Sequence, residues 1–542
     1  MSKREKKIVT MVFIICIVIG LFAVQGYGIN IDENTEIDIA RMDLKEYVRL
    51  FFGESSQLYQ FMNNLIGNLM DSVEIDHGEA LLYPVVAVVS VLRVIGRTDL
   101  GMLVYHMYLY IWFLVGLLAV YQTGKFLTGK PFLSAMGAAF IGLSPVMFGN
   151  AFINNKDMVM LTLTSLCIYT GIRFVETKSR KWSVLWAVTA AFCVNMRIIG
   201  LMFVGLFGGL YLFEFLASRE KKKEEFLNGL LAAVIVVIVF IAITPATWYS
   251  LTGYFQYTIS SSAGFLRWNG YELYCGKLYR YLENNLPWHY FFVCYGVTTP
   301  LFFLAALIAG QVGCVYLIAA KWKEQWNFLK YMLICAIIIW LPMLVFIVKG
   351  ANVTFRHFFF IYPPMVFMAI YVLNQIAKNR KAEKILYLCG ILQMLWCAGL
   401  IVVGHPFEST YFNILAGKNV EEKFEYANLD YYKAALEQVL RMDSADSIVI
   451  SSDNLNCYYG IKQAWEVLNP KEKNRIQVAE PETEACENAD YHVYGESIFI
   501  KENMEAQLGL EKLKKCDPDS KFNTSLGLDA YGKRVITIYY NR

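Results

Sequence analysis

The chain has 542 residues, of which 56% are hydrophobic, 15% are aromatic and only 18% are charged. This composition is too apolar for a soluble protein of that length and indicates a protein that crosses a membrane many times. The formal net charge of +3 argues against a nucleic-acid-binding protein, as does the lack of a Lys/Arg run interleaved with aromatic residues.

An α-helix needs roughly 20 apolar residues to cross the hydrocarbon core of a bilayer. The first such stretch, 8–24, follows the basic start MSKREKK. We interpret it as a retained anchor, because its apolar core is long and no small-residue cleavage site precedes Gln25. Further spans are expected near 101–122, 131–149, 157–175, 182–199, 201–217, 227–246, 291–319, 328–348, 357–376 and 385–403. The length rule therefore predicts about eleven crossings.

The loops between these spans predict the orientation of the chain, because Lys and Arg gather on the cytoplasmic side of a membrane. Every second connection is basic: MSKREKK, GKFLTGK, ETKSRK, SREKKKEE, AKWKEQ and KNRKAEK. The N-terminus is therefore expected in the cytoplasm. The segments expected outside are 26–100, 149–157, 247–290, 349–357 and the chain beyond about Gly404. We expect the protein in the plasma membrane of a bacterium.

The external segments at the two ends of the chain have distinct patterns. In the first external loop, 26–100, apolar residues recur at helical spacing with charges between them, which is typical of helices that lie on a membrane surface. The stretch 80–96 is apolar but short, and a position along the interface stays open for it. Beyond 404, DYYKAALEQVLRM predicts an amphipathic helix, and DSIVISS, DYHVYG and RVITIYY predict strands.

The fold class that follows is a polytopic α-helical membrane protein with a small C-terminal α/β domain. We divide the chain into a transmembrane domain, 1–404, and an extracytoplasmic domain, 405–542. Most of the 12 cysteines lie in or beside apolar spans, where a thiol is a small buried hydrophobe. A disulfide among Cys457, Cys486 and Cys516 stays open, because no spacing fixes a pairing.

Charged residues in and beside the predicted spans crowd toward the external ends of the spans. They include Arg197 in CVNMRIIG, Lys156 and Asp157 in INNKDM, and Arg356 and His357 in VTFRHFFF. A transporter usually places its polar site near the midplane of the bilayer. This distribution instead predicts chemistry at the outer membrane surface, where an enzyme meets a substrate with a polar head group and a lipid tail.

A series of segments carries a family resemblance. In order they are IDENTE, LSPVMFGNAFINNKDM, CVNMRIIG, NNLPWHYFFVCYGVTTP, RHFFFIYPP and HPFESTYFNILAG. Over about 8–432 they resemble the landmarks of GT-C class, lipid-carrier-dependent glycosyltransferases, the group of the protein O-mannosyltransferases and the lipid A aminoarabinose transferase. The resemblance implies that a sugar moves from a polyprenyl-phosphate carrier to an extracytoplasmic acceptor, with inversion of the anomeric centre. The acceptor class, whether glycan, lipid or protein, stays open.

The resemblance places an acidic residue of the first external loop in the catalytic position, and here the pair is Asp32 and Glu33. We assign Asp32 as the general base, because attack by an acceptor hydroxyl requires a proton acceptor at the membrane surface. The alternative for Asp32 is a solvated acid near a helix start. Asp157 is a further candidate; it orients the acceptor, pairs with a cation, or joins Asp32 and Glu33 around a divalent metal ion.

The leaving lipid phosphate gains negative charge as the sugar bond breaks, so it requires preorganised cations. The candidates for donor-phosphate binding are Arg356, Lys156, Arg197 and His357. For the three cationic chains, the alternative is an interfacial side chain that reaches toward lipid head groups.

Asp76 and His77 are weaker candidates for contact with the donor or with a metal ion. Two other functions stay open. A flippase or exporter of lipid-linked sugar would show charges or broken helices at mid-bilayer depth, and a membrane scaffold would tolerate the loss of Asp32 and Asp157.

Overall fold

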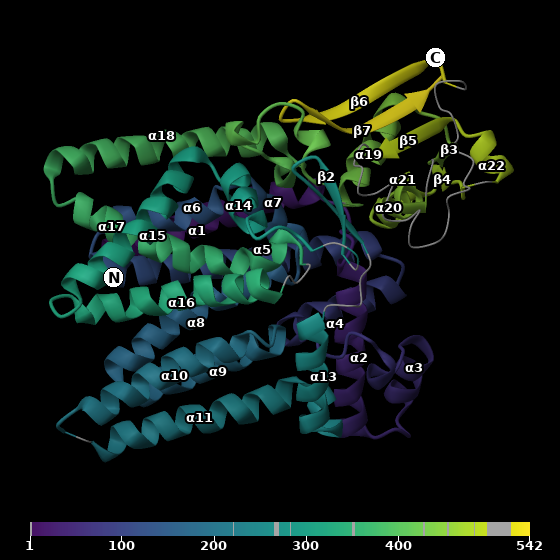
Figure 1. The fold of residues 1–542 in the computed structure, drawn as a ribbon. Helices are drawn as coiled ribbons and strands as arrows, with labels where there is room; N and C mark the ends of the chain where they lie inside the picture. Colours follow the sequence, from purple (N-terminus) through teal and green to yellow (C-terminus); the bar gives the residue numbers. More distant parts are fainter. Residues whose placement is uncertain are drawn as a thin grey trace.

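The computed structural model of the chain describes residues 3–220, 222–264, 270–281, 283, 285–349, 353–426, 429–452, 455–481, 483–495 and 522–541. Long helices form a bundle, and short helices with a small sheet lie beyond one end of it (Figure 1). The expected fold class, a polytopic helical membrane protein with a small C-terminal α/β domain, is confirmed.

Within these residues, 9 helices are long and apolar enough to cross a membrane. They are α1 (Lys3–Ala23), α5 (Thr98–Thr128), α8 (Asp157–Thr177), α10 (Gly200–Ala217), α11 (Lys223–Ile243), α15 (Leu301–Lys321), α16 (Trp326–Lys349), α17 (Tyr362–Ile376), which η4 (Phe355–Ile361) precedes, and α18 (Arg380–Gly404).

Two further expected spans differ from straight, full-length helices. The segment 131–149 becomes α6 (Pro131–Gly142) and α7 (Pro145–Ile153), which meet at 65°. Proline restricts the residue before it to extended conformations, so Pro145 separates the two helices after Ser144. The segment 182–199 becomes α9 (Arg180–Met196), whose 17 residues fall just short of a full crossing and pack against α8 and α11. The sequence therefore predicts more crossings than there are long helices, and these two segments account for the difference.

The basic loops gather at one end of the bundle, where ion pairs join them to one another. The ion pairs are Lys125 with Glu5, Lys130 with Glu383, Lys178 with Glu225, and Lys330 with both Glu176 and Glu214. The N-terminus lies at this end (Figure 1). Such clustering agrees with the charge pattern of the loops, while the assignment of this end to the cytoplasm stays a prediction.

A layer of shorter helices covers the other end of the bundle. It contains α2 (Glu33–Phe52), α3 (Gln57–Leu65), α4 (Tyr83–Val94), α12 (Ala246–Tyr249) and α13 (Leu251–Gly264). In Figure 1, α2 and α13 run across the direction of the bundle helices. The large apolar side chains Phe51, Phe52 and Phe61 are exposed on this layer, as expected for helices at a membrane surface. The segment 80–96 contains the short helix α4 and is not among the helices long enough to span a membrane.

A two-stranded hairpin stands between α13 and α14 (Tyr290–Thr298). Its strands are β1 (Tyr271–Tyr274) and β2 (Lys277–Arg280), and Tyr274 pairs with Lys277 across the turn. Both turn residues have positive φ, 51° at Cys275 and 78° at Gly276. This is the backbone of a tight two-residue hairpin turn, in which glycine avoids the steric cost of positive φ.

The C-terminal region forms a five-stranded sheet with the order β4-β3-β5-β7-β6. Its strands are β3 (Ile448–Ser451), β4 (Ile476–Val478), β5 (Tyr491–Gly495), β6 (Thr524–Ala530) and β7 (Lys533–Tyr540), and its helices are α19 (Tyr432–Met442), α20 (Leu455–Glu466), α21 (Pro470–Lys473) and α22 (Glu484–Glu487). β3 pairs in parallel with β4 and β5, and β7 pairs antiparallel with β5 and β6.

The helix and three strands expected from the sequence of this region are thus confirmed. The region has a hydrophobic core of its own, which includes Leu436, Ile450, Val493 and Ile538. The division at 404 and 405 stays a prediction. Cys516 lies outside the described residues, so the bridge with Cys457 or Cys486 also stays open.

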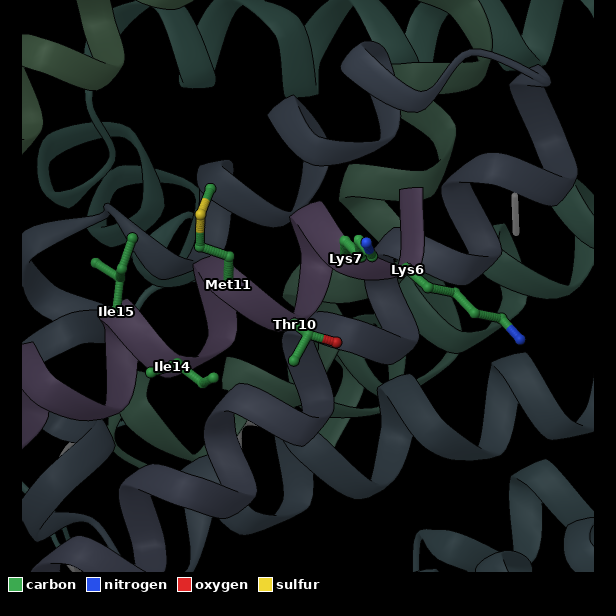
Figure 2. A pocket seen from close by; sticks show the side chains of 6 residues that line it. All are labelled: Lys6, Lys7, Thr10, Met11, Ile14 and Ile15. Atoms are coloured by element: carbon green, nitrogen blue, oxygen red, sulfur yellow. The ribbon is translucent and has the colours of Figure 1, made fainter. Parts of the chain in front are cut away.

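A groove of about 410 Å³ runs along α1 near the basic end of the bundle (Figure 2). Its lining residues are Lys6, Lys7, Thr10, Met11, Ile14 and Ile15. Only 11% of the α1 span is buried, so the groove is part of an exposed helix face. None of the candidate site residues lines it.

Candidate active site

Asp32, before α2, and Arg356, on η4, form an ion pair between Oδ2 of the aspartate and Nη1 of the arginine. Asp32 stands at the N-cap of α2, where an aspartate usually accepts hydrogen bonds from the first-turn amides. Here its side chain makes no such cap bond and points to Arg356 on η4 instead. The side chains are 38% and 30% exposed, respectively, so the pair can be reached from outside the protein.

Asp157 lies behind this pair and is buried, with 1% of its side chain exposed. Its Oδ1 lies 2.5 Å from Nη2 of Arg197, and its Oδ2 lies 3.8 Å from Nη1 of Arg356. The side chain of Asn154 donates to Oδ2 over 3.2 Å. Asp157 therefore holds two guanidinium groups in place.

These contacts bring together the N-cap of α2, the start of α8, the end of α9 and the start of η4. We call Asp32, Asp157, Arg197 and Arg356 the arginine cluster. His357 lies near Asp157 and so belongs to its surroundings. Because each acid is paired with an arginine, the cluster carries no net formal charge.

Lys156 does not join the arginine cluster; its amino group lies 3.3 Å from Oε1 of Glu36. The same carboxylate lies 3.1 Å from Nδ1 of His77, and Nε2 of His77 lies 2.9 Å from Glu74. We call this series, Lys156, Glu36, His77 and Glu74, the histidine chain. The neighbours Lys156 and Asp157 connect it to the arginine cluster.

The charged groups of the histidine chain shift one another's pKa values. Burial by itself raises the pKa of Glu36, but Lys156 and His77 outweigh it and hold that pKa well below its usual range. Burial and Lys156 lower the pKa of His77, yet its contacts with Glu36 and Glu74 leave that pKa above the ordinary value of 6.5. With a carboxylate at each ring nitrogen, both nitrogens can donate when His77 is protonated, so these contacts favour the imidazolium form.

Glu79 lies beside Glu36 in this region. Its side chain is completely buried, and burial together with the neighbouring charge of Glu36 raises its pKa well above the usual range. The neutral form of Glu79 can donate a hydrogen bond to the neighbouring Glu36, which two charged carboxylates could not form. The pKa values of these two acids are therefore shifted in opposite directions, that of Glu36 downward and that of Glu79 upward.

Glu33 points into the protein, away from the arginine cluster. Its carboxylate is fully buried, with Oε1 2.9 Å from Nε2 of His106 and Oε2 accepting the Asn30 amide over 2.6 Å. Burial raises the pKa of Glu33, although His106 and the Asn30 amide oppose this effect. Of the predicted acidic pair, Asp32 alone faces Arg356.

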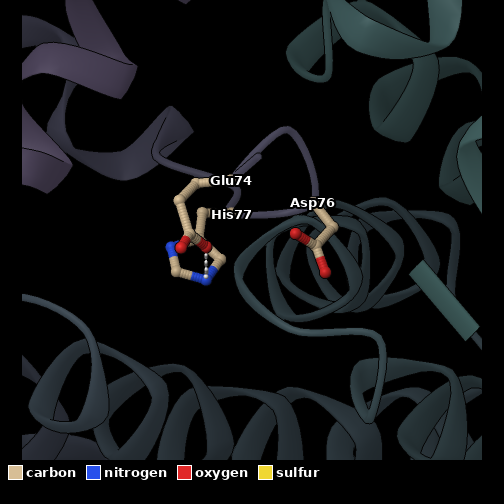
Figure 3. A group of neighbouring side chains, drawn as sticks. All are labelled: Glu74, Asp76 and His77. Atoms are coloured by element: carbon tan, nitrogen blue, oxygen red, sulfur yellow. Dashed lines mark ion pairs between the residues drawn. The ribbon is translucent and has the colours of Figure 1, made fainter. Parts of the chain in front are cut away.

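One group of side chains in the described residues has the spacing of a metal site. Ligand atoms of Glu74, Asp76 and His77 lie within 4.8 Å of one another (Figure 3). A cation bound here would replace the proton on Nε2 of His77, while Glu36 would keep the bond to Nδ1. Asp32, Glu33 and Asp157 do not form such a group in the part of the chain that is described.

Sequence reasoning missed Glu36, Glu79 and Glu272 at this end of the bundle. Glu36 follows Asp32 by four positions on the same helix face, a spacing that could have drawn attention to it. The hairpin that carries Glu272 has its own signal, since YELYCGKLYR alternates apolar and polar residues around a Cys-Gly turn. No sequence signal points to the buried state of Glu79.

The fold and the site define a multi-pass helical membrane protein whose buried and half-buried ion pairs meet beneath an α/β domain. Two similar solved structures are those of ArnT from Cupriavidus metallidurans, one bound to undecaprenyl phosphate and one in the apo state. The structure bound to undecaprenyl phosphate has 11% identity and a TM-score of 0.45, and the apo structure has 10% and 0.42.

Each comparison covers 98% of this chain and 97% of the ArnT chain. No protein-family model and no curated protein sequence matches the chain.

Proposed function

We propose that the protein is a membrane glycosyltransferase that moves a sugar from a polyprenyl-phosphate carrier to an acceptor outside the cytoplasm. The observation that carries this proposal is the arginine cluster. An accessible carboxylate and two guanidinium groups from distant segments meet at one end of an apolar bundle. Glycosyl transfer from a lipid phosphate needs this pair of functions, a proton acceptor and a cationic site for the leaving phosphate.

In the proposed reaction, Asp32 is the general base. It accepts the proton of the acceptor hydroxyl while that oxygen forms a bond to the anomeric carbon of the sugar. The bond from this carbon to the phosphate oxygen breaks, and polyprenyl phosphate departs with the electron pair. Attack from the face opposite the phosphate inverts the anomeric centre.

Arg356 has a double role in this scheme. Its guanidinium group pairs with the carboxylate of Asp32, which is then engaged as a hydrogen-bond acceptor. A guanidinium group binds phosphate oxygens with the same planar geometry that it uses for carboxylates. A donor phosphate that takes the place of Asp32 on Arg356 releases the base, so the base becomes free when the donor arrives.

The remaining candidates have supporting roles in the proposal. Asp157 is a positioning residue, because it is buried and holds Arg197 and Arg356. Arg197 is 23% exposed and offers a second cation to the phosphate. Lys156 is 10% exposed and paired with Glu36, so we assign it to the support of the site. The proposed orientation places the basic loops in the cytoplasm and the arginine cluster and α/β domain outside.

The test is turnover of a labelled polyprenyl-phosphate sugar by the purified protein, with transfer to water or to a crude cell-envelope acceptor fraction. Asp32→Asn keeps the size of the side chain but removes the proton acceptor, and it should lower kcat by a factor of roughly 100 or more. Asp38→Asn is the matched control, since Asp38 is an exposed acid on the same helix that pairs with Arg41. It should retain wild-type turnover.

Circular dichroism and thermal unfolding in detergent show whether Asp32→Asn remains folded. Unchanged turnover in a folded Asp32→Asn protein would remove Asp32 from the role of base. Failure of the wild-type protein to consume any lipid-linked sugar while Asp32→Asn behaves identically would contradict the glycosyltransferase proposal itself.

A further inference from the structure

The β1–β2 hairpin reaches the arginine cluster through Glu272. Oε1 of Glu272 accepts a hydrogen bond of 2.5 Å from the hydroxyl of Tyr290, and Oε2 accepts one of 2.9 Å from Tyr281. The hydroxyl of Tyr290 in turn accepts the backbone N–H of Phe355 over 3.0 Å. Phe355 immediately precedes Arg356, so a continuous series of hydrogen bonds joins the hairpin to the backbone that carries Arg356.

The electrostatic environment of Glu272 points to the same connection. Burial raises the pKa of Glu272, while the two tyrosine hydroxyls and the charge of Arg356 oppose that rise. Arg356 therefore has three carboxyl groups in its surroundings: Asp32, Asp157 and Glu272. Asp32 and Asp157 contact the guanidinium group itself. Glu272 is linked through Tyr290 to the backbone N–H of the preceding residue, Phe355.

The packing of Tyr290 holds this series of hydrogen bonds in a fixed geometry. Tyr290 is fully buried at the start of α14, with its ring against Tyr274 of the hairpin and Phe291 of its own helix. Because the ring cannot move freely, its hydroxyl holds the Phe355 amide at a fixed place. Because the Tyr290 hydroxyl donates its hydrogen to Glu272, its oxygen can accept the N–H of Phe355. The carboxylate of Glu272 therefore determines that Tyr290 is the acceptor in the bond with Phe355.

We propose that Glu272, acting through Tyr290, is a positioning residue for Arg356, and that the hairpin fixes the direction from which this arginine meets the lipid phosphate. The inference rests on the proposed function for the identity of the phosphate ligand. Its structural part, the coupling between Glu272, Tyr290 and Arg356, does not depend on that function.

The experiment measures the affinity of the purified protein for polyprenyl phosphate without a sugar, in wild type and in Tyr290→Phe. The variant keeps the ring and loses the hydroxyl that links Glu272 to the Phe355 amide. We expect about a fivefold loss of affinity, since interactions within one hydrogen-bond network couple at this level. Tyr279→Phe, on β2 of the same hairpin, is the matched control and should bind like wild type.

A double-mutant cycle with Arg356→Lys separates positioning from a general structural effect. Lysine keeps the charge but lacks the planar fork of arginine, so its direction matters less. In the Arg356→Lys background, Tyr290→Phe should change affinity by less than about twofold. Glu272→Gln combined with Tyr290→Phe should show no more loss than Tyr290→Phe alone. Additive losses in either pair would overturn the inference.

The same cycle is measured by thermal unfolding without ligand, which keeps the two proposals apart. If the wild-type protein does not bind polyprenyl phosphate, the proposed function fails, and the unfolding cycle still decides the coupling. Non-additive shifts in Tm for Tyr290→Phe and Arg356→Lys support the link between them. Additive shifts contradict it.

Discussion

At the level of single residues, the site is built from side chains whose partners lie far away in sequence. Asp32 caps no helix amide and pairs with Arg356, and Asp157 pairs with Arg197 although it begins a helix of its own. Charged groups at the rim of an apolar bundle are costly to bury alone, so each acid has a cationic partner. In the arginine cluster these partners are one another.

His77 should make stability depend on pH. Its pKa is raised above 6.5 by Glu36 and Glu74, so its favourable contribution is complete below about pH 6.5 and is lost as the pH rises through the raised value. Glu36 has a lowered pKa and contributes above about pH 4.5, an effect that is lost only at lower pH. His77→Gln should therefore lower Tm most between about pH 5 and 6.5 and progressively less above this range.

The measurement is thermal unfolding in detergent at a series of pH values, with the Tm of His77→Gln subtracted from that of wild type. His289→Gln is the control, because His289 contacts the Tyr274 hydroxyl and no carboxylate in the described contacts. A wild-type minus His77→Gln difference that stays constant from pH 5 to pH 9 would show that His77 is not held as an imidazolium.

At the level of elements, the sequence predicted what depends on local pattern. The spans follow from apolar length, and α19, β3, β5 and β7 follow from periodicity and turn residues. Asp32, Asp157, Arg197 and Arg356 could be selected because they are charged residues at the ends of apolar segments. Their contacts could not be derived in the same way, because a pairing such as Arg197 with Asp157 depends on how α8 and α9 pack.

Glu36 and Glu272 show the limit of this reasoning. On α2, Glu36 has the appearance of one more charge on an amphipathic helix, and only the docking of the 74–79 loop buries it beside His77. Glu272 has an alternating strand around it, but its partners Tyr281 and Tyr290 come from beyond the hairpin. Tertiary packing therefore decides which acids belong to the site.

The docking of that loop against α9 gives a prediction for Gly78. A Cβ atom at this position would lie 1.8 Å from the backbone oxygen of Asn195, a distance that no packing allows. The loop is also tied to α9 because the Ala80 amide donates to the Asn195 side chain over 3.2 Å. Gly78→Ala should force the loop away from α9 and destabilise the protein by about 1–3 kcal/mol or more.

Thermal or denaturant unfolding of the purified protein measures this loss, and turnover shows whether displacement of the loop reaches the arginine cluster. Gly205→Ala, in the middle of α10 with open space around it, is the matched control. Alanine favours the helix there, so stability should stay equal or increase. Wild-type stability in Gly78→Ala would mean that the loop does not lie directly on α9.

At the level of the whole molecule, buried polar contacts join the α/β domain to the segment between α1 and α2. Tyr27 donates to Oε2 of Glu408 over 2.9 Å, and Oε1 of Glu408 lies 2.8 Å from Nδ1 of His405. The amino group of Lys433, on α19, lies 3.3 Å from the backbone oxygen of Tyr27. Because Asp32 lies at the end of this segment, the position of the α/β domain and the position of the proposed base are connected.

Asp430 lies in this junction with only 1% of its surface exposed, and it supplies the last prediction. Burial, followed by the charges of Glu33 and Glu408, raises the pKa of Asp430 well above its usual range. The folded protein then retains a proton that the unfolded chain releases above about pH 4, so this group makes folding less favourable as the pH rises, by up to about 1.4 kcal/mol per pH unit.

Asp430→Asn replaces the acid with a neutral amide, which removes the titrating group from this buried position. We therefore expect a higher Tm than wild type at pH 7, and a gain that shrinks as the pH falls toward about 4. Asp446→Asn, at an exposed position of the same domain, should leave Tm unchanged at every pH. A lower Tm for Asp430→Asn at pH 7 would show that Asp430 is ionised and paired in the folded protein, and that the junction depends on its charge.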